Sequence, residues 1–290
     1  MSEGLPSALK ALYPFSSSWI DQPGGRQHYI DVGEGHPVIM VHGNPTWSFY
    51  YRDLARAVAD QGMRAIVPDH LGCGLSDKPQ DWSYCLADHI ENVLRLIKEL
   101  GLTRFSIVVH DWGGAIGMGV ATELSEAVER IVVLNTAAFR SKRLPLRIAA
   151  CRWPFIGRFL VRGLNGFAGP ATRMTTVQPL SRDLKDGYLW PYRSWADRIA
   201  IARFVEDIPM NENHPSYDRL VKVEEGLTSL REKPMLIAWG GRDWCFNASF
   251  FREWQARFPE AQTHWKQDCG HYVLEDGGDE LHQQIAQFLK

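Results

Sequence analysis

Asp111 occupies the position of a catalytic nucleophile in the segment VVHDWGG, residues 108–114. The segment joins an apolar run to a stretch of small residues, which is the setting of a strand-to-helix turn that lifts one side chain above a sheet. In the usual pattern G-x-nucleophile-x-G, Gly113 supplies the second glycine and Val109 replaces the first. A carboxylate is ionised near neutral pH and attacks without help from a base. The simpler interpretation is that Asp111 caps the following helix.

Two later segments supply possible partners for this carboxylate. GGRD at 240–243 follows an apolar run, and CGH at 269–271 lies near the C-terminus. Asp243 and His271 could be ordinary loop residues, but the order nucleophile, acid, histidine is typical of hydrolases with such a turn. We therefore predict His271 as the general base and Asp243 as the acid that orients it. The other position for the acid holds Asn135, which carries no charge, so Asp243 is preferred.

The loop HGNPTW, residues 42–47, follows another apolar run. A loop at this place can aim a backbone N–H at the nucleophile as half of an oxyanion hole. Asn44 also offers a side-chain amide. On its own this loop is better explained as a simple turn, because glycine, asparagine and proline favour turns.

Composition narrows the function classes. The chain has 290 residues, is 45% hydrophobic and 23% charged, and has a net charge of −2. These values predict a packed globular protein and argue against nucleic-acid binding and a polybasic membrane anchor. The five cysteines form no C-x-x-C pair, and the N-terminus has no signal-peptide pattern, so we expect a cytoplasmic protein without disulfides. No apolar run reaches the roughly 20 residues of a membrane span, and no Walker loop, zinc motif or dinucleotide fingerprint is present.

Apolar runs alternate with helical patterns along most of the chain, which predicts a mostly parallel sheet flanked by helices. Between residues 138 and 213 the alternation stops, and helical patches such as 146–161 suggest an inserted cap. We therefore expect a core made of residues 1–137 and 214–290 and a helical cap of residues 138–213. The predicted strands are 26–31, 37–41, 64–67, 105–109, 131–134 and 235–239, and the predicted helices are 54–61, 86–100, 115–124 and 281–289.

Taken together, these residues resemble the haloalkane dehalogenases, a family with the α/β-hydrolase fold. The resemblance covers nearly the whole chain and is carried by residues 42–47, 68–79 and 110–114, the cap, Asp243 and His271. Residues 68–76 and 164–168 look most like the third subfamily. That subfamily is close to the β-lactone decarboxylases of long-chain olefin synthesis, and these motifs do not separate the two groups.

The resemblance implies a role for each site residue. Asp111 would displace halide from carbon and form an ester, while Asn44 and Trp112 bind the departing halide. His271, held by Asp243, would activate water to hydrolyse the ester. The implied partners are a small apolar substrate, either a haloalkane or a β-lactone, with water and a halide ion. No metal or organic cofactor is implied, and the substrate and the oligomeric state stay open.

Other functions remain possible from the sequence alone. An epoxide hydrolase uses the same nucleophile with acidic donors, for which Tyr188, Tyr192 and Tyr217 are candidates, although that family usually has an aromatic residue where Asn44 stands. A serine esterase is disfavoured by the aspartate itself. A ligand-binding receptor that reuses the fold is disfavoured by the complete set of nucleophile, base and acid.

Overall fold

The structure is a computed structural model that describes residues 5–290. Eight strands form one sheet in the order β1-β2-β4-β3-β5-β6-β7-β8. β1 and β2 pair antiparallel, β2 also runs antiparallel to β4, and all other neighbours are parallel. The predicted fold class is confirmed. The strands are Ser17–Gln22, Gly25–Val32, His36–Val41, Met63–Pro68, Phe105–Asp111, Val128–Thr136, Met235–Gly240 and Gln262–Lys266.

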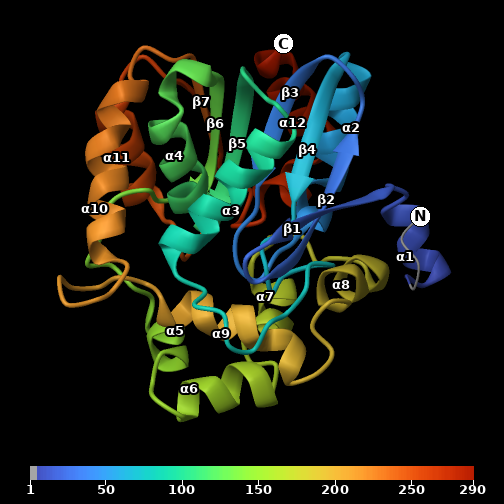
Figure 1. The fold of residues 1–290 in the computed structure, drawn as a ribbon, viewed down its shortest axis with the longest axis vertical. Helices are drawn as coiled ribbons and strands as arrows, with labels where there is room; N and C mark the ends of the chain where they lie inside the picture. Colours follow the sequence, from blue (N-terminus) through green and yellow to red (C-terminus); the bar gives the residue numbers. More distant parts are fainter. Residues whose placement is uncertain (1–4) are drawn as a thin grey trace.

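Helices cover both faces of this sheet (Figure 1). On one face, Val38 and Met40 of β3 belong to the apolar cluster that includes residues of α2 and α12. On the other face, Ile39 and Val41 pack in the cluster shared with α3, α4, α10 and α11. Because alternate side chains of each strand point to opposite faces, burial on both faces explains the nearly continuous apolar strands. These helices are α2 Arg52–Asp60, α3 Leu86–Glu99, α4 Trp112–Glu123, α10 Tyr217–Gly226, α11 Ala248–Arg257 and α12 Val273–Leu289.

The predicted elements are present, but several bounds differ. α4 begins at Trp112, directly after the strand, and not at residue 115. The last helix begins at Val273, eight residues before its predicted start, and contains one non-helical residue, Gly278. β1 and β8 were not predicted, because both are edge strands with mostly polar or half-exposed side chains. No helix within residues 5–290 is long and apolar enough to span a membrane.

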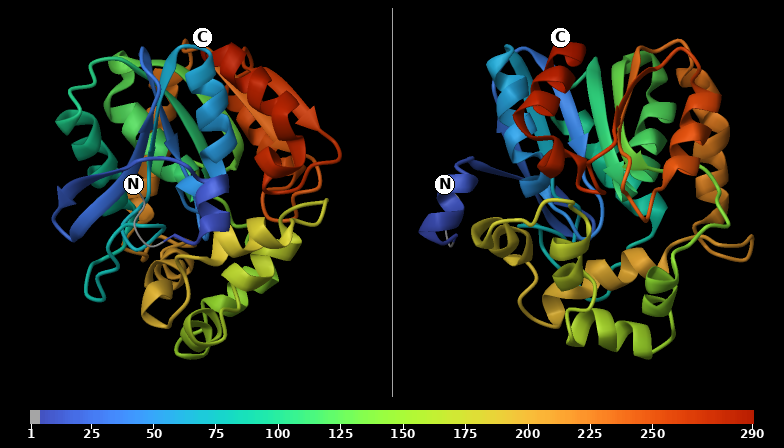
Figure 2. Two further views of the ribbon diagram at one scale, coloured as in Figure 1. Left: turned by 90° about the vertical axis from the view of Figure 1, so that its right-hand side faces the viewer. Right: turned by 180° about the vertical axis from the view of Figure 1, so that it is seen from behind.

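Residues 138–213 contain only helices and connecting loops. They lie beyond the carboxyl ends of the parallel strands, at the end of the molecule opposite the C-terminus (Figures 1 and 2). The helical patch predicted at 146–161 is interrupted between α5, which ends at Cys151, and α6, which begins at Ile156, because Pro154 disfavours helical geometry for the residue before it. The helices of this segment are α5 Leu146–Cys151, α6 Ile156–Arg158, η3 Phe159–Gly163, α7 Ala168–Met174, α8 Arg182–Leu189, η4 Ala196–Arg198 and α9 Ile199–Glu206.

Candidate active site

Asp111 is the last residue of β5, and α4 begins at the next residue. Its backbone has φ 52° and ψ −127°, which is rare for a residue with a side chain and turns the chain sharply from strand to helix. Strained backbone of this kind is concentrated at functional sites. The carboxylate makes no capping hydrogen bond to α4, so the interpretation of Asp111 as a helix cap is wrong.

Glycines are needed around this turn because the backbone segments lie very close together. A Cβ on Gly113 would lie 2.0 Å from the carbonyl oxygen of Val41, and a Cβ on Gly43 would lie 2.2 Å from Oδ1 of Asp111. Only glycine avoids such contacts without moving backbone. Two motifs 70 residues apart in the sequence thus meet at one carboxylate.

The structure brings the predicted nucleophile, base and acid together. Nδ1 of His271 lies 2.7 Å from Oδ2 of Asp243, and its Nε2 lies 3.5 Å from Oδ2 of Asp111. All three side chains are buried. The imidazole is therefore held between two carboxylates, one on each ring nitrogen, with Asp243 in the orienting position.

Asn135 holds the side chain of Asp243 by a hydrogen bond, a contact that the sequence did not predict. Its Nδ2 donates to Oδ2 of Asp243 over 3.0 Å, and its Oδ1 accepts from the backbone N–H of Gly240 over 2.8 Å. The backbone N–H of Cys245 donates to the other oxygen, Oδ1 of Asp243, over 2.6 Å. Asn135 was weighed only as a replacement for the acid. The signal that could have found it is its place near the end of β6, next to the strand before Asp243.

Two further residues hold His271 and were also missed. Nε2 of His110 donates to the backbone carbonyl of His271 over 2.9 Å. Phe246 stacks on the imidazole, with the ring centres 5.7 Å apart and the planes 20° apart. Burial, together with the neighbouring His271, lowers the pKa of His110 to about 3, so this ring stays neutral.

Charge within the site is set by the contacts of the imidazole. Burial alone would raise the pKa of Asp111, but the hydrogen bond and charge of His271 hold it below the ordinary value. Burial alone would lower the pKa of His271, but Asp243 and Asp111 raise it to about 10. Near neutral pH the resting site therefore contains an anionic Asp111 beside an imidazolium.

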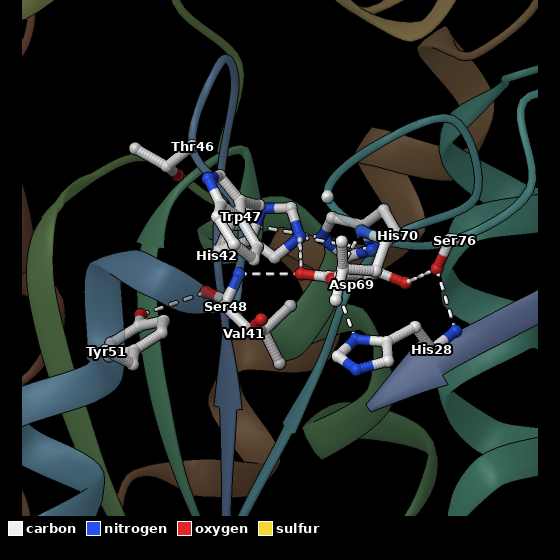
Figure 3. A network of polar contacts seen from close by, with 12 residues as sticks. His28, Val41, His42, Thr46, Trp47, Ser48, Tyr51, Asp69, His70 and Ser76 are labelled. Atoms are coloured by element: carbon white, nitrogen blue, oxygen red, sulfur yellow. Dashed lines mark hydrogen bonds and ion pairs between the residues drawn. The ribbon is translucent and has the colours of Figure 1, made fainter. Parts of the chain in front are cut away.

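The loop that carries Asn44 is fixed by a buried polar network (Figure 3). Asp69 accepts from the backbone N–H of Ser48 over 2.7 Å and lies 2.8 Å from Nδ1 of His28. His42 accepts from the backbone N–H of His70 over 3.1 Å, and Nε2 of His70 donates back to the carbonyl of His42 over 2.9 Å. Nδ1 of His70 has no partner within residues 5–290, but the bonds to Ser48 and between His42 and His70 still hold the two ends of the loop in place.

Asn44 and Trp112 offer hydrogen-bond donors next to the nucleophile. The backbone N–H of Asn44 donates to Oδ1 of Asp111 over 2.7 Å, and its side-chain Nδ2 donates to the carbonyl of Ile201 over 3.2 Å. Within residues 5–290 the indole N–H of Trp112 has no acceptor, and both residues line a cavity that contains Asp111. These N–H groups can stabilise an anion that leaves when Asp111 attacks.

Two cavities meet at Asp111. The first chamber extends towards α4, α10 and α11, and the second extends towards α5 and α7; each has about 890 Å³ of space, part of it open to solvent. Five residues line both chambers, so the chambers join at Asp111. These five residues are Asn44, Asp111, Ile148, Phe167 and Cys245. Apolar walls in two directions suit a substrate with two hydrocarbon arms.

The three tyrosines weighed as epoxide donors are not brought to this site. The hydroxyl of Tyr188 donates to Glu275, and that of Tyr192 donates to the carbonyl of Thr46 over 3.3 Å. Neither of them, nor Tyr217, lines either chamber.

Comparisons with known proteins identify the family of this chain. Residues 36–168 match the family described as alpha/beta hydrolase fold. A cis-3-alkyl-4-alkyloxetan-2-one decarboxylase of Shewanella oneidensis is 43% identical over 97% of this chain and 90% of that protein. A protein with the same name from Xanthomonas campestris is 36% identical, over 96% of this chain and 97% of that one.

Haloalkane dehalogenases form the second group of relatives. Haloalkane dehalogenase 2 of Mycobacterium tuberculosis is 31% identical over 93% of each chain. Haloalkane dehalogenase DbeA from Bradyrhizobium elkani has a similar structure, with a TM-score of 0.86 over 95% of this chain and 97% of that one, at 22% identity. The chain therefore belongs to the haloalkane dehalogenase family of the α/β-hydrolase fold, together with the related oxetanone decarboxylases.

Proposed function

We propose that the protein decarboxylates cis-3,4-dialkyl oxetan-2-ones, which are β-lactones, through Asp111. The observation that carries this proposal is the pair of apolar chambers that join at the nucleophile. A β-lactone with alkyl groups on two adjacent ring carbons has two hydrocarbon arms that diverge from the reacting bond, one for each chamber. The name of the Shewanella relative describes such a substrate. In this proposal residues 138–213 act as the cap that encloses both arms.

Ring opening would be the first step. An oxygen of Asp111 attacks ring carbon C4, the C4–O bond breaks, and its electron pair goes to the oxygen that becomes part of a free carboxylate. The product of this step is an ester of Asp111. The imidazolium of His271 and the N–H donors of Asn44 and Trp112 stabilise the carboxylate as it forms, since preorganised donors act where charge develops.

Loss of carbon dioxide would complete the reaction. The bond between C3 and the carboxylate breaks, and its electron pair forms the C3=C4 double bond. The aspartyl oxygen leaves C4 at the same time and regains its charge. Atoms and charge balance with an alkene and carbon dioxide as the products. No water is consumed, so His271 keeps its proton, consistent with its raised pKa.

Haloalkane hydrolysis is the second candidate, favoured by the free indole N–H of Trp112 beside the nucleophile. Here Asp111 displaces halide, and Asn44 and Trp112 hold the leaving ion. Ester formation removes the negative charge of Asp111, one of the two carboxylates that raise the pKa of His271. The pKa of His271 then falls, the imidazolium releases its proton to solvent, and the neutral imidazole can take a proton from the water that cleaves the ester.

A side-by-side assay tests the two reactions. Purified protein is incubated with a cis-dialkyl β-lactone and with a bromoalkane, and alkene, carbon dioxide and bromide are measured. We expect alkene and carbon dioxide in equal amounts from the lactone, lost when Asp111→Asn is tested. Bromide release without alkene formation would overturn the decarboxylase proposal in favour of the dehalogenase.

The Trp112→Phe variant tests whether the indole N–H of Trp112 acts mainly on a departing halide. Removal of one anion-hole donor should slow bromide displacement by about 10²–10³-fold. The rate with the lactone should fall less, because its leaving oxygen stays tethered to the substrate. Trp265→Phe, at a partly exposed position on β8, is the matched control and should leave both rates unchanged. Small and equal losses on both substrates would contradict the assignment of Trp112.

The covalent step is tested by intact mass. In His271→Ala, hydrolysis should stop while alkylation continues, so a bromoalkane should leave an alkyl adduct on Asp111. An inactive variant without an adduct would contradict nucleophilic attack by Asp111 on that substrate.

A further inference from the structure

The net charge of −2 conceals a strongly basic segment. Residues 138–181 contain eight lysines and arginines and no aspartate or glutamate. Four of the eight are exposed and make no ion pair within residues 5–290; these are Lys142, Arg143, Arg147 and Arg173. The total charge of the chain therefore does not describe the charge at this end of the molecule.

The same segment exposes large apolar side chains. Phe155 is 87% exposed and Leu164 is 63% exposed, which is unusual for side chains of this size. Phe159 and the nearby Trp195 both flank Gly163, since a Cβ there would lie 3.2 Å from one ring and 3.5 Å from the other. We call six of the exposed apolar residues of this end the distal patch; they are Trp153, Phe155, Ile156, Phe159, Leu164 and Trp195. Helix α6, which contributes to it, lies at the extreme end of the molecule opposite the C-terminus (Figures 1 and 2).

The basic residues stand beside the substrate chambers. Arg143 lines the first chamber and Arg147 lines the second. Both precede or belong to α5, which contacts α6 of the distal patch. Cationic groups at the chamber walls and apolar rings on the adjoining helices thus occupy one end of the molecule.

We propose that this end docks on an anionic lipid surface. Aromatic and aliphatic side chains enter the boundary between headgroups and acyl chains, while lysine and arginine are attracted to anionic headgroups. A second copy of the chain fits less well, because it would bring two positive surfaces together. Docking would place both chambers next to the phase in which long-chain apolar compounds dissolve. The charge and the exposed apolar side chains of this end are the same whichever reaction Asp111 performs.

Vesicle flotation with the full chain tests the proposal without turnover. The probes are phosphatidylcholine vesicles with and without phosphatidylglycerol, and we expect binding mainly to the anionic vesicles, weakened by salt. Phe155→Ser/Phe159→Ser should reduce binding at least tenfold, because two rings no longer leave water. Lys142→Gln/Arg173→Gln should reduce it about thirtyfold, from roughly 1 kcal/mol for each charge near an anionic surface.

Matched variants elsewhere serve as controls. Trp265→Ser removes an exposed ring on β8, and Arg95→Gln/Lys98→Gln removes two charges on α3; neither variant should differ from wild type in vesicle binding. Hydrolytic or decarboxylating activity on a short, soluble substrate should be unchanged in Phe155→Ser/Phe159→Ser, which separates this proposal from the proposed function. No binding to anionic vesicles, or equal binding by all variants, would overturn it. So would a concentration-dependent dimer that the distal-patch variant abolishes, because the patch would then be covered by a second copy.

Discussion

Around Asp111 the backbone is packed so closely that a Cβ on Gly113 would lie 2.0 Å from a carbonyl oxygen of β3. In residues 138–213 the contrast is clear at Gly163, where a Cβ would meet only ring atoms, at 3.2 Å or more. Backbone cannot move without disturbing a whole sheet, whereas a ring at the surface can rotate. The turn at Asp111 is therefore held by backbone contacts, whereas the surface around Gly163 can adjust. The helical segment has an equally close backbone contact at Gly157, where a Cβ would lie 2.1 Å from the carbonyl oxygen of Cys151.

The charged side chains of the two regions also differ in their surroundings. The carboxylates of Asp111 and Asp243 are buried and joined through His271. Residues 138–181 hold unpaired cations at the surface instead. Buried charges must be paired, and each one lost leaves a partner uncompensated, whereas exposed charges contribute little to stability. The comparison predicts that the same substitution has unequal consequences in the two regions.

The largest expected effect comes from changing a carboxylate to an amide. Asp243→Asn should reduce turnover of the accepted substrate by about 10³–10⁴-fold, because the imidazole loses its orienting acid. With a bromoalkane, hydrolysis of the ester should suffer more than its formation, and stopped-flow kinetics can separate the two. Glu206→Gln, the matched change in α9, removes a partner of Arg158 and Arg203 and should alter turnover less than about twofold.

If both amide variants lose similar activity while remaining folded by circular dichroism, the division between site and helical segment is wrong. An unaffected hydrolytic step in Asp243→Asn would point to another carboxylate as the acid.

A smaller difference is expected for glycine-to-alanine changes. Gly113→Ala should lower the free energy of unfolding by about 3 kcal/mol, because its methyl group has no space beside Val41. Gly163→Ala should stay within about 1 kcal/mol of wild type, since helix propensity offsets a mild contact. Urea unfolding of the two variants measures the difference, and comparable losses would show that the helical segment is as tightly constrained as the turn.

The smallest effect is expected at Asp207, where the helical segment meets α3. Burial raises the pKa of Asp207 to about 6, although the hydroxyl of Ser216 and the backbone N–H of Leu86 donate to it. Because the folded-state pKa lies above the unfolded value, the stability due to the bound proton is present below about pH 4 and is lost as pH rises through about 6.

Asp207→Asn should therefore raise the free energy of unfolding by roughly 1 kcal/mol near neutral pH and by little in acid. Thermal unfolding at several pH values checks this. Parallel pH profiles for the variant and wild type would contradict the contribution of Asp207.

The local pattern of apolar residues was enough to predict the strands in the interior of the sheet. The run 105–109 and the loop 42–47 were identified because buried parallel strands are continuously apolar and end at turn residues. The edge strands β1 and β8 escaped because half-exposed polar strands have no such pattern. The break after Cys151 was missed because the apolar spacing continues across Pro154.

The sequence predicted Asp111, His271 and Asp243 as nucleophile, base and acid, since they stand in a specific order within specific motifs, and the structure brings the three side chains together. Only the tertiary structure decided that Asn135 donates to Asp243, that the three tyrosines lie away from the chambers, and that two chambers meet at Asp111. The physical reason is the distance along the chain over which each feature is defined. Residue types and their spacing within a motif are local. A cavity, or a hydrogen bond between residues 108 positions apart, exists only once distant segments pack together.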